Sequence, residues 1–223
     1  MAKQAELPSS SLSVALLLSL AGGFLDSYTF FNRGGVFSNA QTGNIVLLGV
    51  SLVNGQGESF LRYLIPILAF LVGIVLSLTV EHVLNRLHIR MVRRGILVLE
   101  MAILAAVALL PVEDRFFNMA ANVLVSFVCA MQMETFRTFR GEPIATTMST
   151  GNLRKCAENL FHGWIKHERE RLRIAGYYLS VILVFVLGAA LSALCSDIFA
   201  GLAALMPVGI LGAAIVVITV KKR

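Results

Sequence analysis

The chain has 223 residues, of which 57% are hydrophobic and 14% are charged, and its mean hydropathy is +0.79. A soluble domain of this length cannot bury so many apolar side chains in one core, so the composition excludes an ordinary soluble protein and indicates a membrane protein. The formal net charge of +6 is compatible with nucleic acid or with a membrane surface, and the placement of the basic residues decides between them.

Six apolar stretches are long enough to cross a hydrocarbon core of roughly 30 Å as α-helices. Helices satisfy their own backbone hydrogen bonds inside lipid, so we expect an all-helical integral membrane domain that takes up the whole chain, 1–223. The first stretch continues past Gly23, which favours a retained helix over a cleaved signal peptide. The predicted spans are Leu12–Phe31, Tyr63–Val80, Ile96–Val112, Phe116–Met133, Ile174–Leu194 and Ile198–Val220.

Basic residues are distributed unevenly between the segments that connect these spans. Segments 81–95 and 134–173, together with the two termini, hold 16 of the 19 Lys and Arg residues. The other connections hold only Arg33, Arg62 and Arg115. Positively charged segments stay in the cytoplasm, so we expect both termini on the cytoplasmic side. The asymmetry also supports an even number of spans, and it makes the lipid bilayer a better partner than nucleic acid.

Short motifs in the first half of the chain recur in the second half in the same order. The offsets between the copies are 107, 108 and 115 residues. Each half holds three spans, and three is odd, so the second half must enter the bilayer upside down. We therefore expect a 3 + 3 inverted repeat, with repeat one at about 11–112 and repeat two at about 116–220, as in many secondary transporters. A duplication that merely makes a stable bundle is the alternative. The matching motifs are Arg33-Gly34 with Arg140-Gly141, Thr42-Gly43-Asn44 with Thr150-Gly151-Asn152, and Tyr63 and Gly73 with Tyr178 and Gly188.

A short half-helix is predicted after each Thr-Gly-Asn motif, because glycine permits a backbone turn and Thr or Asn can cap a helix. The nine apolar residues Ile45–Val53 reach roughly 14 Å as a helix, about half of a hydrocarbon core, which is typical of a re-entrant segment. The segment after the second copy is amphipathic, with Leu153 and Phe161 opposite Arg154 and Lys155, and we expect it at the cytoplasmic surface. Both motifs can instead serve only close helix packing.

Asp26 is the main candidate for a functional ionisable residue, because it lies inside the first span beside small residues. A carboxylate in such a position should face protein or water rather than lipid. Two structural interpretations stand beside this one. The carboxylate can lie hydrated near the end of its helix, or it can form an ion pair with Arg33.

Two further carboxylates lie near the ends of predicted spans. Glu100 enters the third span close to the basic loop, so we expect it to pair with Arg93 or Arg94. Glu134 lies where the fourth span ends, and we expect it to contact Arg137 as an interfacial charge.

No enzymatic activity, cofactor or metal is predicted. The sequence contains no HExxH, GxSxG or GxxxxGK[ST] signature. The three cysteines, Cys129, Cys156 and Cys195, lie far apart and have no metal-ligand spacing.

The motifs at Gly23–Asp26, Gly35–Asn39 and Thr42–Asn44 resemble the opening signature of the YoaK family of small bacterial membrane proteins. That family's second motif usually reads Gly-x-Gln-Asn, whereas Ala130–Met133 reads Ala-Met-Gln-Met here. The resemblance covers nearly the whole chain and implies a six-helix protein of the bacterial inner membrane. It supplies neither a substrate nor a catalytic residue.

Together these features favour a transporter or channel for a small polar or ionic solute, which the sequence does not identify. The alternative is a non-transporting scaffold or lipid-binding protein that uses the basic cytoplasmic loops. A water-accessible polar cavity between the halves would favour transport, and a dry interface would favour the scaffold. The sequence leaves open whether the chain forms a homo-oligomer. The candidate residues of the solute path are Asp26, Asn39, Thr42, Gly43, Asn44, Gln132, Thr150, Gly151 and Asn152.

Overall fold

A computed structural model describes residues 10–55, 57–86 and 92–220, and every named element in it is a helix, as predicted. The Thr-Gly-Asn motifs lie in the first turns of α2 and α6, so the predicted short helices are confirmed at both places. The elements are α1 (Leu12–Asn32), α2 (Gln41–Val53), α3 (Gly57–Arg86), α4 (Val92–Ala108), α5 (Arg115–Thr135), α6 (Ser149–Ile165), α7 (Arg169–Phe199), the 3-10 helix η2 (Ala200–Ala204) and α8 (Leu205–Val220).

Four stretches of the described helices are long and apolar enough to cross a membrane, which indicates a multi-pass membrane protein. Five of the predicted spans fall inside them. These stretches are Leu12–Asn32, Gly57–Val83, Arg115–Thr135 and Arg169–Val220.

Two predicted span boundaries are wrong. The third predicted span was to end at Val112, but α4 ends at Ala108, because Pro111 lacks an N–H and restricts the residue before it. A break between the last two spans was predicted between Leu194 and Ile198. The chain instead continues as α7 to Phe199 and turns through η2, where the first residue adopts φ 45°.

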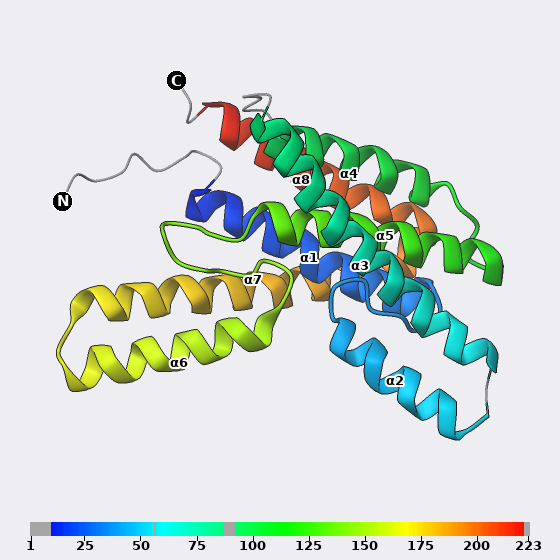
Figure 1. The fold of residues 1–223 in the computed structure, drawn as a ribbon, viewed down its shortest axis with the longest axis horizontal. Coiled ribbons are helices and arrows are strands. Elements are labelled where there is room, and N and C mark those ends of the chain that lie inside the picture. The colour runs from blue at the N-terminus through cyan, green and yellow to red at the C-terminus, as the bar shows by residue number, and fades with distance from the viewer. Residues whose placement is uncertain (1–9, 56, 87–91, 221–223) are drawn as a thin grey trace.

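The helices form a bundle in which α1 runs through the centre (Figure 1). α1 packs against α7, and α5 packs against α3, while α4 and α8 pack against each other. The start of α1 and the end of α8 lie at one end of the bundle, and the α4–α5 connection lies at the other (Figure 1). α2 packs along α3 and α6 along α7, and both short helices start in the middle of the molecule and run in opposite directions (Figure 1).

Glycines allow two of these helix pairs to approach backbone to backbone. A Cβ atom on Gly23 of α1 would overlap the carbonyl of Phe185 on α7, and one on Gly188 would overlap the backbone of α1. In the same way, a Cβ atom on Gly73 of α3 would lie 2.6 Å from the carbonyl oxygen of Phe127 on α5. Small residues of this kind let helices pack closely in membranes, where the hydrophobic effect does not drive association.

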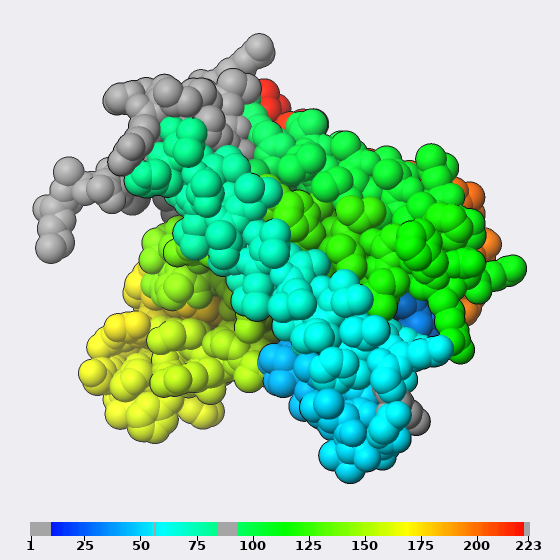
Figure 2. Space-filling model, turned by 45° about the vertical axis from the view of Figure 1, so that its right-hand side comes forward, coloured from blue at the N-terminus to red at the C-terminus, as the bar shows by residue number. Residues whose placement is uncertain are grey.

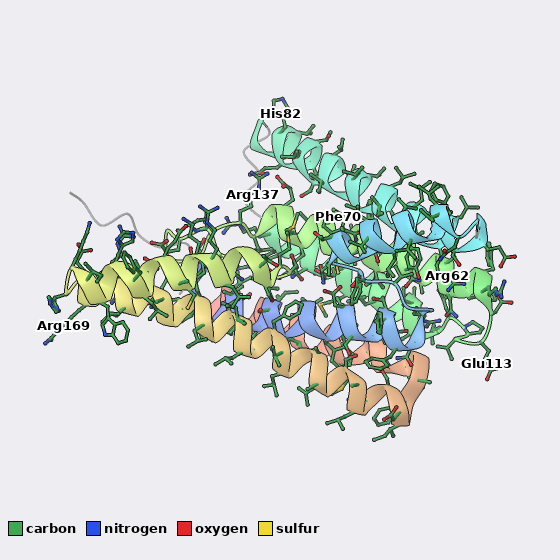
Figure 3. The ribbon with its side chains drawn as sticks, turned by 90° about the horizontal axis from the view of Figure 1, so that it is seen from below. Arg62, Phe70, His82, Glu113, Arg137 and Arg169 are labelled. Atoms are coloured by element: carbon green, nitrogen blue, oxygen red, sulfur yellow. The ribbon has the colours of Figure 1, made fainter. Side chains whose placement is uncertain are left out.

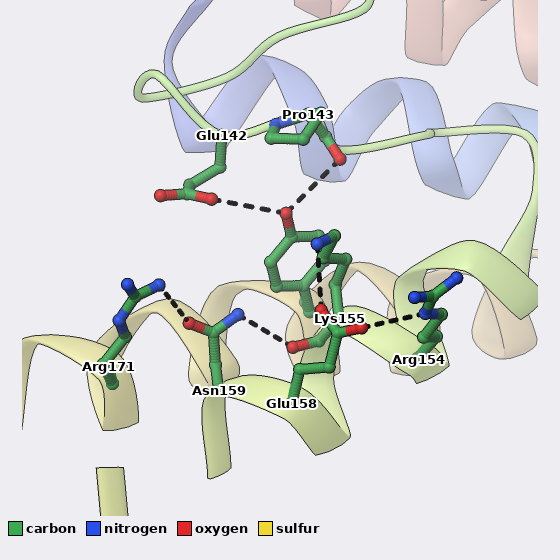
Figure 4. Close-up of polar contacts among 8 residues, drawn as sticks. Glu142, Pro143, Arg154, Lys155, Glu158, Asn159 and Arg171 are labelled. Carbon is green, nitrogen blue, oxygen red and sulfur yellow. Dashed lines mark hydrogen bonds and ion pairs between the residues drawn. The ribbon is translucent and has the colours of Figure 1, made fainter. Parts of the chain in front are cut away.

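α6 and α7 form a hairpin that carries a cluster of polar contacts. Lys155 and Arg154 both pair with Glu158 on α6, and Arg171 of α7 donates to Asn159 (Figure 4). The hydrogen bonds from Lys155 and Arg154 hold the pKa of the half-exposed Glu158 below its ordinary value. The hydroxyl of Tyr178 on α7 donates to Glu142 and to the carbonyl of Pro143, and both of these acceptors are labelled in Figure 4.

α6 buries a face of small and polar residues and exposes its apolar residues. Asn152, Cys156, Asn159 and Gly163 are buried against the rest of the protein. Trp164, by contrast, is 79% exposed, and the apolar side chains on the same side of the helix are also open. This is the reverse of the pattern in a soluble protein and is typical of a helix with lipid around it. Its position at the cytoplasmic surface stays a prediction.

Candidate functional site

A cavity of about 700 Å³ lies where the loops that enter α2 and α6 come together. The lobes formed by α2 and α6 stand apart, and the molecular surface is hollowed between them (Figure 2). Both halves of the chain line the cavity. Its lining residues are Asp26, Ser27, Phe30, Phe31, Phe37, Asn39, Ala40, Gln41, Thr42, Phe70, Met133, Thr147, Met148, Ser149, Thr150, Phe185 and Ala189.

Asp26 projects from α1 and holds the loop that leads into α2. One carboxylate oxygen, Oδ1, accepts a hydrogen bond of 2.6 Å from the backbone N–H of Asn39. The same oxygen accepts bonds of 3.3 Å from the Ser38 hydroxyl and from the Ala40 N–H. Asp26 is only 6% exposed, so a hydrated position at the end of its helix is ruled out. Its negative charge lies at the start of α2, where the helix dipole is positive.

Arg33 does not pair with Asp26, so the alternative interpretation of Asp26 as half of an ion pair is wrong. Its buried guanidinium donates to the carbonyl oxygens of Val107, Leu110 and Pro111, at distances of 3.0, 3.0 and 2.8 Å. These carbonyls lie where α4 ends, at the negative end of its helix dipole. Arg33 thus closes the C-terminus of α4, a contact that no local sequence pattern indicates.

Asn44 and Asn152 lie beside the cavity but do not line it. The Asn44 amide accepts a hydrogen bond from the N–H of Phe37 and donates to the carbonyl of the same residue, at 3.0 and 2.6 Å. Asn152 makes the same two bonds to Ala145, at 3.2 and 2.5 Å. Both side chains therefore position the loops that form the cavity wall.

The glycines of the two motifs do not make turns, so this part of the prediction is wrong. Gly43 and Gly151 lie in the first turns of α2 and α6, and neither is among the residues with positive φ. Gly43 instead makes room for the ring of Phe37, whose Cδ2 atom would lie 2.9 Å from an added Cβ. Gly151 has open space beside it.

Gln132 lies away from the cavity and against Glu100. With its amide oriented to donate, the Gln132 nitrogen lies 3.0 and 3.2 Å from the two carboxylate oxygens of Glu100. Both residues are 1% exposed. Glu100 therefore meets Gln132 rather than Arg93 or Arg94, and that predicted pairing is wrong. The predicted contact between Glu134 and Arg137 is confirmed as an ion pair.

The cavity brings together four of the nine predicted path residues: Asp26, Asn39, Thr42 and Thr150. Sequence reasoning missed Thr147, Phe70 and Phe185. The repeat offsets relate all three to other lining residues, because 108 residues separate Asn39 from Thr147 and 115 separate Phe70 from Phe185. Phe70 lies about midway along the length of the molecule (Figure 3).

Within the described part of the chain, two buried polar atoms of residues that line the cavity have no hydrogen-bond partner. These are Oδ1 of Asn39 and Oγ1 of Thr147, and both residues are 2% exposed. The Asn39 amide nitrogen is used, since it donates to the carbonyl of Gly22. Buried polar atoms without partners are costly and rare, and they point to a bound ligand or water.

A second pocket of about 370 Å³ lies at the end of the bundle near Arg62 and Glu113 (Figure 3). Arg33, Arg62 and Arg115 all line it, and these are the three basic residues that the sequence separates from the rest. The Arg33 guanidinium is occupied by carbonyls, and Arg115 forms an ion pair with Glu58. This pocket is therefore the weaker candidate. Across the described residues, no three metal-ligating side chains come together.

Comparison with known proteins gives one match. Residues 14–218 match the sequence model of the family described as protein of unknown function (DUF1275). No curated protein and no solved structure matches the chain.

Proposed function

The chain belongs to the DUF1275 family, and we propose that it is a transporter or channel that moves a small polar or ionic solute through the cavity between its halves. We also propose that it falls among the YoaK proteins, on the strength of the motifs at its start. Neither family description supplies a substrate, so the proposal rests on the residues of the cavity.

The cavity lined by both halves is the observation that carries this proposal. A scaffold needs a packed interface, whereas this chain leaves about 700 Å³ open there. The walls of that space include Asn39 and Thr147, whose buried side-chain oxygens have no partner among the described residues. Pockets with a few polar atoms among apolar side chains are typical of small-molecule sites. The absence of an enzymatic sequence signature makes passage of a solute a better proposal than its chemical conversion.

The proposed path includes an inverted repeat, and matching contacts support it. In such a repeat α1 corresponds to α5, and α3 corresponds to α7. The α1–α7 contact then corresponds to the α5–α3 contact, and both contacts are present. The glycine contacts correspond as well. Gly188 meets the carbonyl of Leu20, and Gly73 meets that of Phe127, the residue 107 positions after Leu20. Inverted repeats place their sites at the interface of the two halves.

The two short helices suit the two ends of a path. α2 leads from the cavity toward the end with the α4–α5 connection, and α6 leads toward the end where α1 starts (Figure 1). We propose that small shifts of α2 and α6 open the cavity alternately to the two sides. Asp26, Asn39 and Thr42 would then face the solute from the outer half, and Thr150 from the inner half.

The orientation proposed for the path rests on charge. Arg169 lies toward one end of the molecule, Arg62 and Glu113 lie toward the other, and His82 and Arg137 lie between them (Figure 3). The first end carries the basic segments and would face the cytoplasm of a bacterial inner membrane. The exposed apolar residues of α6, next to Arg154 and Lys155, would then contact the inner leaflet.

A flux measurement tests the proposal. Purified protein in liposomes would be screened for uptake of labelled amines, amino acids, carboxylates and inorganic ions, against protein-free liposomes. Thr42→Phe and Thr150→Phe fill the cavity and should abolish any uptake found. Thr79→Phe makes the same change on the exposed surface of α3 and should leave uptake intact.

A second readout separates transport from the scaffold alternative. In a cysteine-free background, single cysteines at Thr42 and Thr150 should react with a small water-soluble thiol reagent, because the proposed path requires the cavity to be open to water. Unreactive cysteines at both positions, together with no uptake of any solute, would favour the scaffold and reject transport.

A further inference from the structure

The charge of the cavity is set by a single side chain. Among the described residues that line it, Asp26 is the only ionisable one, and no Lys, Arg or His is present. The arginines that lie nearest in the sequence, Arg33 and Arg62, line the other pocket instead. The wall of the cavity therefore carries a negative charge and no fixed positive side chain.

Asp26 has one oxygen left for a ligand. All three of its hydrogen bonds, from Asn39, Ser38 and Ala40, go to Oδ1. No group among the described residues donates to Oδ2, and that atom is not fully enclosed by protein. The bonds to Oδ1 hold the carboxylate in place without occupying its second oxygen. An acceptor of this kind is suited to a donor that carries positive charge.

The negative charge is present in only one of the two halves. The residue 107 positions after Asp26 is Met133, which also lines the cavity. The lining otherwise corresponds well between the halves, with Asn39 opposite Thr147 and Thr42 corresponding to Thr150. A cavity with one carboxylate suits a ligand with a single positive charge. It does not suit Ca²⁺ or Mg²⁺, which prefer six or more oxygen ligands.

Aromatic rings make up much of the remaining wall. Phe30 and Phe37 stack with their ring centroids 4.8 Å apart, and Phe70 and Phe185 line the cavity from α3 and α7. The faces of aromatic rings attract organic cations, and they do so more strongly where water is excluded.

We propose that the cavity binds a small monovalent organic cation, a protonated or quaternary amine, with its positive nitrogen beside Asp26 and its carbon atoms against the phenylalanine rings. This assignment names the class of solute and rests on the proposed function only for the claim that the solute is carried. The binding itself does not depend on transport.

The test uses a pair of probes that differ in charge and hardly at all in shape. Choline is a quaternary ammonium ion, and 3,3-dimethylbutan-1-ol replaces its nitrogen by carbon. Binding to the purified protein would be measured by calorimetry and by the midpoint of thermal unfolding, with sodium chloride at the same ionic strength as a reference. Choline, and ethanolamine as a primary amine, should stabilise the protein saturably, and the neutral isostere should not.

Variants then locate the site. Asp26→Asn should weaken choline binding by about tenfold or more, because it removes the charge and keeps the volume. Asp197→Asn makes the same change at an exposed position of α7 and should have no effect. If Asp26→Asn does not fold, Met133→Lys replaces it as the test. That variant keeps Asp26 and adds a positive charge to the lining, so it should also abolish choline binding.

Several outcomes would overturn the proposal. They are equal binding of choline and its neutral isostere, an equal shift with sodium chloride, binding of neither amine, or full choline binding by Asp26→Asn. Choline binding without uptake into liposomes would keep the cation site and reject transport. Uptake of an anion or a neutral solute without choline binding would reject the cation site and keep transport.

Discussion

Asn44 and Asn152 lie 108 residues apart and make the same pair of hydrogen bonds, each to the backbone of the residue seven positions before it. The amide oxygen accepts from an N–H and the amide nitrogen donates to a carbonyl. A side-chain amide carries an acceptor and a donor side by side, so it can make both bonds at once. We call each pair of hydrogen bonds a clamp. Each clamp fixes the loop before a short helix, and the two loops together form the rim of the cavity.

Asn44→Asp should lower the free energy of unfolding by about 1–3 kcal/mol, because Asp cannot donate to the carbonyl of Phe37 and leaves it facing a carboxylate. Asn152→Asp should have a similar effect through Ala145. Thermal unfolding in detergent measures both. Asn54→Asp is the matched control, since Asn54 is exposed at the end of α2. A loss no larger than that of the control would show that the clamps do not hold the loops.

Gly188→Ala should destabilise the protein, because the added Cβ would overlap the carbonyl of Leu20 and push α7 away from α1. Overpacking of this kind typically costs about 1–3 kcal/mol. Gly49→Ala is the control, because nothing lies within 4 Å of its added Cβ. Alanine is the better helix former, so Gly49→Ala should be neutral or stabilise by up to about 1 kcal/mol. The opposite signs, read from thermal unfolding, make the comparison sharp, and equal effects would contradict the close crossing.

Arg33→Lys should destabilise the protein by about 2 kcal/mol or more, because an ammonium cannot reach all the carbonyls at the end of α4 that the guanidinium binds. Arg62→Lys, at the exposed rim of the second pocket, should cost little. The Arg33→Lys and Asp26→Asn changes should add within about 0.5 kcal/mol, since the two residues do not interact. A coupling well above that value would restore the ion pair that the structure rejects.

Single cysteines in a cysteine-free background test the orientation. A cysteine at Glu113 should react with an impermeant maleimide in intact cells, and cysteines at His82 and His167 should react only after the cells are opened. Glu113 and Arg169, which is two residues beyond His167, lie toward opposite ends of the molecule (Figure 3), so the results at Glu113 and His167 are linked. His88, which lies in the same segment 81–95 as His82, is outside the described residues. Labelling of His167 from outside would reverse the proposed topology.

Local sequence patterns determined the secondary structure and the environment of this protein. Apolar stretches of about 20 residues predict helices in lipid, because each helix satisfies its own backbone hydrogen bonds. The repeated Thr-Gly-Asn motif also predicted the two short helices from local sequence, because its asparagine bonds to backbone only seven residues away. The end of α4 near Pro111 was also a local signal, and the predicted span simply ran past it.

The tertiary structure alone decided the partners of the buried charged residues Asp26, Arg33 and Glu100. Asp26 reaches the loop of residues 38–40, Arg33 reaches the end of α4, and Glu100 reaches Gln132, although each had a more obvious partner nearby in the sequence. Long-range polar pairing depends on which helices are neighbours, and small residues such as Gly23 and Gly188 set those neighbours by permitting backbone contact. Sequence spacing carries no record of that contact. The cavity exists for the same reason, because it is space that the packed helices leave open between them.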